Sequence, residues 1–410
     1  MQDYQLYEQL LGITQPWFVK AVTLRPSPGE VEVEIGCQES LWACPLCRQR
    51  MQVHDYQRRR WRHLNTCQFK TMVVCEVPRV KCQEHGTQVV SVPWAEKFGR
   101  FTKLFERFAI DVMQECSISA ACELLGISWD EADGIKQRAV ARGQQRKRAE
   151  VMPRLCVDEK SIGAGQRYAT VVVSLPGGQA ARVEYVGEDR RQQSLDGFWE
   201  QLTSEQKSGI EAIAMDMWEP FLDSARAHVP EAEKKIAHDP FHLVRYMNEA
   251  VNDVRKQEHR SLMKVKDDRL AGSRFHWLYG LEKLPEKVRE GFQRLSQQIL
   301  KTARAWRLKE AFRWFWWLAD RQEALRYYTQ WYRWAIRSRL EPVKKVARMF
   351  QRHLNRILNF FEHRLTNGPI EGINNKIASL IKKAYGYRNF FRFRNDVLFH
   401  LGGLDLYPDQ

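Results

Sequence analysis

The stretch LCVDE at residues 155–159 decides how the chain folds around its candidate site. Its alternating apolar residues predict a short buried strand that presents Asp158 at its carboxyl end, before a polar turn that contains glycine. Two further acidic residues, Asp216 and Glu371, stand where a strand ends or a helix begins. We therefore hypothesise that the fold brings these three carboxylates together.

Short strands and helices are predicted around this stretch. In chain order they are strands at residues 155–157, 168–175 and 181–186, a helix at about 193–202, a strand at 210–215, a helix at about 221–228 and a strand at 235–237. Tight turns join the first three strands, which predicts an antiparallel meander. Three antiparallel strands followed by a helix, a strand, a helix and a strand is the order of the ribonuclease H-like fold. In this order Asp158 and Asp216 lie on adjacent strands, whereas either aspartate alone is more often a turn residue or a helix cap.

The third carboxylate, Glu371, is predicted to lie on a helix. Thr366 or Asn367 can cap this helix, Pro369 fits its first turn, and Gly386 ends it. The buried stripe is expected to contain Ile370, Ile373, Ile377, Leu380 and Ala384. Glu371 lies just off the stripe, near the positive end of the helix dipole, so we expect an ionised carboxylate that can bind a metal ion. The plainer alternative is a first-turn glutamate that only interacts favourably with the dipole.

The composition favours a large globular protein with a polyanionic partner. The 410 residues are 44% hydrophobic and can bury a large core, divided into roughly two to four domains. The formal charge of +15 favours nucleic acid over an acidic small molecule. No export signal is found, and no apolar run approaches the roughly 20 residues that span a bilayer, so we expect a cytoplasmic protein without a membrane partner. Nine cysteines in such a protein favour reduced thiols and a metal site over disulfides.

Soft ligands near the amino terminus indicate a zinc ribbon, which follows a predicted hairpin of residues 17–24 and 31–35. The expected zinc ligands are Cys44, Cys47, Cys82 and His85. They form two pairs at short spacing, and each pair can offer both ligands to one tetrahedral ion. His54, His63 or Cys67 could replace one ligand. Without a metal, the first cysteine pair would simply be small core residues.

Four arginines surround an indole between the two ligand pairs. They are Arg58, Arg59, Arg60 and Arg62, with Trp61 among them. On a small module held by a metal, such residues suit contacts with phosphate and cation–π stacking. The alternative is a charged turn exposed to solvent.

Residues 117–145 carry the pattern of a helix-turn-helix. Ser117 can cap a first helix, Gly126 can end it, and Ser128 or Asp130 can cap the second. The apolar residues expected to face the core are Ile118, Ala121, Leu124, Leu125, Ala132, Ile135 and Ala139. Many helical hairpins share this pattern, but its basic flank favours DNA binding, with the second helix in the major groove. The DNA contacts expected here are Lys136, Arg138, Arg142 and Arg146.

Residues 243–363 are predicted to be helical and are rich in arginine and aromatic residues. The aromatic residues between Trp306 and Trp334 are denser than one helix face requires. Such rings can stack on unpaired bases at a DNA end, but we expect most of them to fill the core of a helical insertion.

Six segments follow one another in a diagnostic order along nearly the whole chain. They are CPLC at 44–47, the helix-turn-helix, VDEK at 157–160, AMDMW at 214–218, DPFH at 239–242 and NGPIEGINNK at 367–376. Together they resemble the DDE transposases of bacterial insertion sequences, and most closely the group named for the element IS-L-three. The last segment is the most specific of the six.

The resemblance implies a ribonuclease H-like catalytic domain, interrupted by an all-helical insertion, in which Asp158, Asp216 and Glu371 hold two magnesium or manganese ions. His242 would lie near the scissile phosphate or a flanking strand, or would serve only as a structural partner of Asp239. The second zinc pair ends in histidine where cysteine is common in the group, and imidazole also binds zinc well.

The expected fold is therefore multidomain α+β. Its parts are a zinc ribbon domain (1–95), a helix-turn-helix region with a linker (96–150), the first part of the catalytic domain (151–245), the helical insertion (246–362) and the last part of the catalytic domain (363–410). Further expected DNA contacts are Lys376, Lys382 and Lys383. The resemblance implies binding to terminal inverted repeats and target DNA, and pairing of two element ends favours a homodimer or a larger homo-oligomer on the bacterial nucleoid.

Transfer of phosphodiesters requires an activated water or 3′-hydroxyl and stabilisation of the leaving oxygen. Two hard cations about 4 Å apart supply both when clustered carboxylates hold them. The expected function is a transposase that cleaves DNA at the element ends and transfers the strands to target DNA. The alternative is a non-catalytic DNA-binding regulator, which has no need for three carboxylates beside a polyanion. A nuclease of the Holliday-junction type is a weaker third option.

Overall fold

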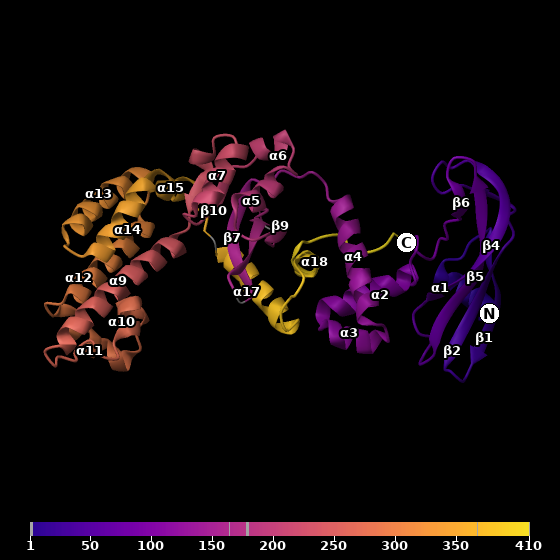
Figure 1. Cartoon of the computed structure of the whole chain (residues 1–410), viewed down its shortest axis with the longest axis horizontal. Coiled ribbons are helices and arrows are strands. Elements are labelled where there is room, and N and C mark those ends of the chain that lie inside the picture. The colour runs from indigo at the N-terminus through magenta and orange to yellow at the C-terminus, as the bar shows by residue number, and fades with distance from the viewer. Residues whose placement is uncertain (1–2, 164, 178–179, 367, 410) are drawn as a thin grey trace. The chain divides into compact units, whose positions relative to one another are not determined.

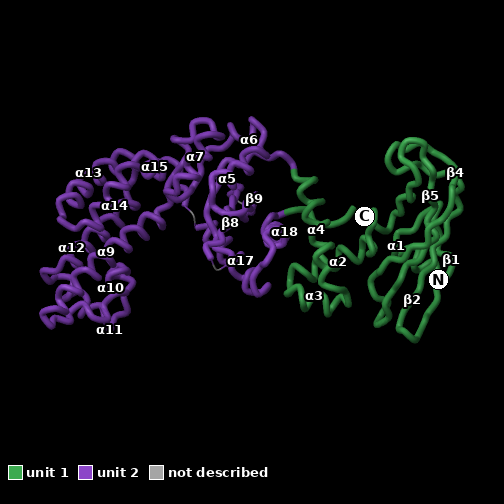
Figure 2. The backbone as a smooth tube through the Cα atoms, in the orientation of Figure 1, with its two compact units in different colours: residues 1–147, 404–410 green, residues 148–403 purple. Residues whose placement is uncertain are grey.

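The computed structural model describes residues 3–163, 165–177, 180–366 and 368–409, which form two compact units (Figure 1). Unit 1 contains residues 1–147 and 404–410, and unit 2 contains residues 148–403. Figure 2 draws unit 1 in green and unit 2 in purple. The last residues of the chain therefore belong to the unit that the first 147 residues build.

A six-stranded sheet forms the first part of unit 1. Its elements are α1 (Asp3–Leu11), β1 (Trp17–Arg25), β2 (Glu30–Cys37), β3 (Leu41–Ala43), β4 (Arg50–Arg62), β5 (Lys70–Cys82) and β6 (Gly86–Val89). The strand order is β1-β2-β5-β4-β3, with β6 paired to β5, and β1 and β2 form the predicted hairpin. Trp94 packs edge-on against Trp17 and Trp61, with ring centroids 5.1 and 5.5 Å apart. These indoles lie in the core of the sheet.

Three helices complete unit 1, and their local signals agree with the sequence. They are α2 (Lys103–Glu115), α3 (Ile118–Leu125) and α4 (Trp129–Arg146). Ser117 caps α3, Gly126 ends it with a φ of 64°, and Ser128 caps α4 through a reciprocal capping box with Glu131. The cap of α4 is thus Ser128 and not Asp130.

The predicted apolar stripe of these helices is correct except at its edge. Ala121, Leu125, Ala132, Ile135 and Ala139 are buried. Leu124, however, is 73% exposed. The face of α3 that packs against α2 and α4 carries its neighbours and not Leu124 itself. Ile118 is half-buried.

The sheet of unit 2 contains the predicted meander and two further strands. The strands are β7 (Arg154–Gly163), β8 (Arg167–Ser174), β9 (Arg182–Glu188), β10 (Ala212–Met215) and β11 (Ile236–His238), in the order β11-β10-β7-β8-β9. β7, β8 and β9 are antiparallel, whereas β10 runs parallel to both β7 and β11. The prediction that Asp158 ends its strand is wrong: β7 remains paired with β8 as far as Gly163, so Asp158 lies in mid-strand opposite Val171.

Helices cover both faces of this sheet. They are α5 (Gln192–Trp199), α6 (Ser204–Ser208), α7 (Glu219–His228), α8 (Ala232–Lys235), α17 (Gly368–Lys383) and α18 (Phe390–Leu401). α5 and α7 share a core with Leu155 and Val157 of β7. Because successive side chains of a strand point to opposite faces, Asp158 points away from this core, towards α17, which contacts β7.

Between β11 and α17 the described residues form helices joined by loops, without a strand. The elements are α9 (Pro240–Met263), α10 (Arg274–Leu278), η1 (Leu281–Lys283), α11 (Glu286–Gln297), α12 (Lys301–Trp314), η2 (Phe315–Trp317), α13 (Arg321–Arg337), α14 (Glu341–Arg352), α15 (Leu354–Leu358) and α16 (Phe360–His363). Most of the aromatic residues between Trp306 and Trp334 belong to one core, as expected, whereas Trp314, Trp317 and Trp334 are exposed. Among the described helices, none has both the length and the apolar character needed to cross a membrane.

A buried histidine makes the stability of unit 1 sensitive to pH. Nδ1 of His63 lies 2.8 Å from Oγ1 of Thr102, the residue that caps α2, and burial together with Arg62 lowers the pKa of His63 to about 4. The unfolded chain binds a proton below pH 6.5 that the folded chain does not, so stability is lost as the pH falls from 6.5 towards 4. We expect unit 1 to lose about 2 kcal/mol of unfolding free energy between pH 7 and pH 5.

Hydrogen exchange of the β4 and α2 amides at the two pH values, corrected for intrinsic exchange rates, measures this loss. The His63→Gln variant cannot titrate at this position and should lose less stability than the wild type. Equal losses in the two proteins would contradict the assignment.

Candidate active site and metal centre

A small cavity in unit 2 lies between β7, the start of α9 and the start of α17. Its volume is about 140 Å³. The residues that line it are Asp158, Asp239, Phe241, His242, Gly368, Ile370, Glu371 and Asn374. Two of the three predicted carboxylates, Asp158 and Glu371, therefore face one space. Asp216 borders it, because its Oδ1 lies 3.9 Å from Nδ1 of His242.

Neighbouring strands position the two aspartates. β10 is parallel to β7, and Ala214 lies opposite Cys156. Asp216 follows Ala214 by two residues, and Asp158 follows Cys156 by two residues. The backbone amide of Glu159 donates to Oδ1 of Asp158 at 2.8 Å, and the amide of Met217 donates to Oδ1 of Asp216 at 2.7 Å. Both carboxylates are therefore held by the backbone that follows them.

α17 brings its own polar face to Asp158. The side-chain amide of Asn374 donates to Oδ2 of Asp158 at 2.8 Å. Glu371 precedes Asn374 by three residues, so both lie on one face of the helix. Ile370, Ile373 and Ile377 of the predicted stripe are buried, whereas Leu380 and Ala384 are half-buried. Of the two predicted caps of this helix, Asn367 lies outside the described residues.

Burial dominates the electrostatics of Asp158. It raises the pKa of Asp158, and the nearby Asp216 carboxylate adds to this rise. His242, the Glu159 amide and Asn374 act in the opposite direction and favour the ionised form. A cation placed beside Asp158 would also favour ionisation.

The first turns of α9 surround Asp216. Nη2 of Arg245 lies 3.2 Å from Oδ2 of Asp216, and the hydroxyl of Tyr246 lies 3.4 Å from the same atom. His242 is buried between Asp216 and Asp239, and its Nδ1 is 3.8 Å from Oδ2 of Asp239. The sequence interpretation missed Arg245 and Tyr246. The available signal was helical spacing, since these two residues follow His242 by three and four residues.

The four predicted zinc ligands form a cluster in unit 1. The ligand atoms of Cys44, Cys47, Cys82 and His85 all lie within 4.8 Å of one another. Sγ of Cys82 is 3.6 Å from Sγ of Cys47 and 3.5 Å from Nδ1 of His85, and the contact with His85 lowers the pKa of Cys82 to about 6. Thiolate and imidazole at these distances suit a tetrahedral zinc ion. Of the three alternative ligands considered above, His63 is instead bonded to Thr102, and His54 and Cys67 are not in the cluster.

The arginine cluster of unit 1 lies within β4 and not in a turn. Trp61 is fully buried, and the guanidinium of Arg59 stacks over its ring at 5.0 Å and donates to the Gly99 carbonyl at 3.2 Å. Arg62 donates to the His63 carbonyl at 2.7 Å. Arg58 and Arg60 are exposed, although Arg60 lies 3.3 Å from Glu30. Two of the four arginines thus contribute to the local structure of the sheet.

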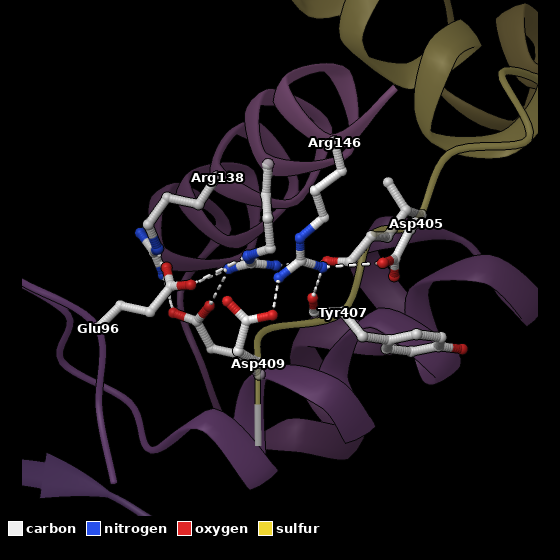
Figure 3. A network of polar contacts seen from close by, with 9 residues as sticks. Glu96, Arg138, Arg146, Asp405, Tyr407 and Asp409 are labelled. Atoms are coloured by element: carbon white, nitrogen blue, oxygen red, sulfur yellow. Dashed lines mark hydrogen bonds and ion pairs between the residues drawn. The ribbon is translucent and has the colours of Figure 1, made fainter. Parts of the chain in front are cut away.

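The basic residues of α4 are also engaged inside unit 1. Lys136 and Arg142 are buried, Nε of Arg138 lies 3.1 Å from Glu106, and Nη2 of Arg142 lies 2.7 Å from Glu96. Figure 3 shows that Arg146 reaches Asp405, Tyr407 and Asp409 at the carboxyl terminus. Acidic partners distant in sequence thus pair with the arginines of this helix, and their predicted contacts with DNA stay a prediction. By contrast, Lys376, Lys382 and Lys383 of α17 are exposed.

Family models match three consecutive parts of the chain. The model of the DDE transposase of the ISL3 family, described as "Transposase", matches residues 155–397. The model described as "zinc-finger of transposase IS204/IS1001/IS1096/IS1165" matches residues 40–85. The model described as "Helix-turn-helix domain of transposase family ISL3" matches residues 90–140. The predicted zinc ribbon and helix-turn-helix are thereby confirmed as family features.

Two curated relatives extend this similarity along the chain. The transposase for insertion sequence element IS1001 of Bordetella parapertussis is 28% identical over 400 residues, which cover 95% of this chain and 96% of the relative. The transposase for insertion sequence element IS1557 of Mycobacterium tuberculosis is 27% identical over 424 residues, which cover 95% of this chain and 93% of the relative. Since one transposase model alone spans more than half of the sequence, the chain belongs to the ISL3 family of insertion-sequence transposases.

Proposed function

We propose that this protein is a metal-dependent DNA transposase that binds the terminal inverted repeats of its insertion sequence, cleaves DNA at the element ends and transfers the freed 3′-hydroxyl ends to target DNA. The observation that carries the proposal is the pocket at which Asp158 and Glu371 meet beside Asp216. A transposase that acts on DNA in this way works on the bacterial nucleoid, in the cytoplasm.

The sheet of unit 2 supports a ribonuclease H-like catalytic domain. Read from β9 to β11, its strand order is three antiparallel strands followed by two parallel ones, in the order 3-2-1-4-5 of the chain. The helices α9 to α16 come between β11 and α17, which supports a helical insertion. We therefore keep the proposed divisions at residues 95, 150, 245 and 362, with the addition that residues 404–410 join unit 1.

The side chains of the pocket fit hard divalent cations. Asp158, Asp216 and Glu371 would hold two Mg²⁺ or Mn²⁺ ions, which prefer carboxylate oxygens. Within the described part of the chain, Nδ1 of His242 and Oδ1 of Asn374 are buried without a hydrogen-bond partner, as expected where a ligand completes a site. When bound, such ions activate water or a 3′-hydroxyl and stabilise the leaving oxygen.

The chain's own residues prepare this chemistry. Asn374 orients Asp158, while Arg245 and Tyr246 hold Asp216 through its Oδ2. His242 lies against the pocket, where its imidazole can reach a phosphate or retain Asp239 as a structural partner. Among these side chains, the guanidinium of Arg245 is the permanent positive charge nearest to Asp216. It therefore compensates the negative charge of Asp216 when no metal ion is bound.

The amino-terminal modules would recognise the DNA. The ribbon would be held by zinc through its four-ligand cluster, and the helix-turn-helix would lie in the major groove of the repeats. The exposed candidates for phosphate contacts are Arg58, Arg60, Lys376, Lys382 and Lys383. Joining two element ends requires two active sites, so we propose that a homodimer or a larger homo-oligomer assembles on DNA.

Loss of any one carboxylate should abolish catalysis but not DNA binding. Asp158→Asn, Asp216→Asn and Glu371→Gln should each slow magnesium-dependent cleavage of labelled repeat DNA by at least about 100-fold, because a metal ligand contributes several kcal/mol. Glu159→Gln is the matched control, since Glu159 points to the opposite face of β7 and pairs with Arg190 at 3.2 Å. If one of the three variants cleaved at the wild-type rate, its residue would not belong to the site. If the wild type bound the DNA but did not cleave it, with or without EDTA, the non-catalytic regulator would be favoured.

Asn374 should tune the metal site without being essential. Asn374→Ala removes the hydrogen bond to Asp158, and we expect a loss of about 10–100-fold in metal affinity or activity, as for other partners of metal ligands. The measurement is the Mn²⁺ concentration that gives half-maximal cleavage, together with Mn²⁺ binding by calorimetry. Asn375→Ala is the control, because its exposed side chain is on the same helix. The same Mn²⁺ dependence in both variants would show that Asn374 does not position Asp158.

The cysteine and histidine cluster should bind about one zinc ion per chain. Elemental analysis of the purified protein measures this stoichiometry. Cys82→Ser should lower it and destabilise the sheet of unit 1, whereas Cys67→Ser, an exposed cysteine outside the cluster, should change neither. Zinc content that is unaffected by Cys82→Ser would place the metal elsewhere.

A further inference from the structure

We propose that α2 and α4 of unit 1 form a binding surface for an acidic peptide, that the chain's own residues 404–409 occupy it, and that DNA phosphates compete with this segment for Arg146. We call residues 404–409 the C-terminal strap. The inference rests on the proposed function only in taking DNA as the competing anion.

Two arginines of α4 hold the strap through both main-chain and side-chain oxygens. Arg142 donates to the carbonyl of Leu406, and Arg146 donates to the carbonyl of Tyr407 at 2.6 Å (Figure 3). Arg146 also lies 3.0 Å from Oδ2 of Asp405 and pairs with the carboxylate of Asp409. A surface that binds a peptide recognises backbone carbonyls as well as carboxylates. An ordinary surface ion pair involves only the carboxylate.

The surface also fits the strap sterically. A Cβ atom at Gly143 would lie 2.7 Å from Cβ of Leu404 and 3.1 Å from the Asp405 carbonyl. Glycine in a helix interior lowers helix stability, and here the close approach of the strap explains why it is present. Leu406 is only 3% exposed, which anchors the strap between its acidic residues.

α2 supplies the other side of the surface. The hydroxyl of Tyr407 donates to Oδ1 of Asp111 at 2.6 Å, and the guanidinium of Arg107 lies 4.7 Å from the centre of the tyrosine ring. Arg107 and Asp111 are four residues apart on the exposed face of one helix, α2. The strap therefore contacts two helices of the helix-turn-helix region and not α4 alone.

The charged contacts of the strap are exposed enough for another anion to replace them. The side chains of Asp405 and Asp409 are 62% and 87% exposed, and ion pairs of this kind are weak and screened by salt. Arg146 is followed directly by Lys147 and Arg148, so a phosphate backbone near this basic run would meet the same guanidinium. While the strap is bound, Arg146 is withheld from DNA, whereas Arg142 is buried and also pairs with Glu96.

The salt dependence of DNA binding tests the competition. Full-length protein and a chain that ends at Gly403 are titrated with a fluorescent random-sequence duplex at several NaCl concentrations. If Arg146 engages a phosphate once the strap is absent, the slope of log K against log [NaCl] should become steeper by about 0.9, since each phosphate contact releases about 0.9 counterion. The double variant Asp405→Asn, Asp409→Asn should shift the slope in the same direction, and Gly143→Ala should do so by displacing the strap.

Two controls separate the strap from a general change of charge or fold. The double variant Glu115→Gln, Glu123→Gln changes the charge by the same amount at exposed positions of α2 and α3 and should leave the slope unchanged. A synthetic peptide of residues 404–410, added to the truncated chain, should restore the wild-type slope, whereas the same peptide with both aspartates replaced by asparagine should restore it less. Restoration also shows that the truncated chain is folded.

The outcomes distinguish this inference from the proposed function. If the wild type binds DNA and the truncated chain has the same salt slope, the strap does not compete with DNA, and the proposed function is unaffected. If the truncation and the charge control steepen the slope equally, the effect is only electrostatic and the inference is overturned. If the full chain does not bind DNA at any salt concentration, both proposals are overturned.

Discussion

The partial burial of one carboxylate, that of Asp158, is the constraint on which unit 2 depends. A charged group in mid-strand is costly unless hydrogen bonds or cations compensate it. The backbone amide of Glu159 and the side chain of Asn374 provide two such hydrogen bonds, and Asn374 comes from a helix more than 200 residues away in sequence. The contact of α17 with β7 is therefore also the contact that satisfies Asp158, so the last helices must return to the sheet for the strand to be stable.

The same constraint gives the two faces of the sheet different roles. Leu155 and Val157 point into an apolar core with α5 and α7, which fixes the strand rigidly. Asp158 points to the polar face, where α9 and α17 begin. A site built in this way has one side set by close packing and the other set by hydrogen bonds, which is how catalytic groups are held without free rotation.

The sequence predicted those features that depend on local pattern, and it failed where the partner is remote. The caps at Ser117 and Ser128, the β1–β2 hairpin and the β7–β8–β9 meander follow from turn and capping residues close in sequence. The length of β7 depends on pairing with β8, so the polar residues after Asp158 were misinterpreted as a turn. The partners of Arg142 and Arg146 come from residues 96 and 405–409, and no periodicity within α4 indicates them.

The division of unit 1 into two stretches of chain has a consequence for biosynthesis. The ribosome makes residues 404–409 only after residues 1–147 and the whole of unit 2 between them. At about 5–20 residues per second, this interval lasts roughly 10–50 s. During that time the DNA-binding helices of a nascent chain are complete but lack the strap, while the catalytic unit is still unfinished. On the proposal above, a nascent chain would therefore meet DNA while Arg146 is not yet occupied by the strap.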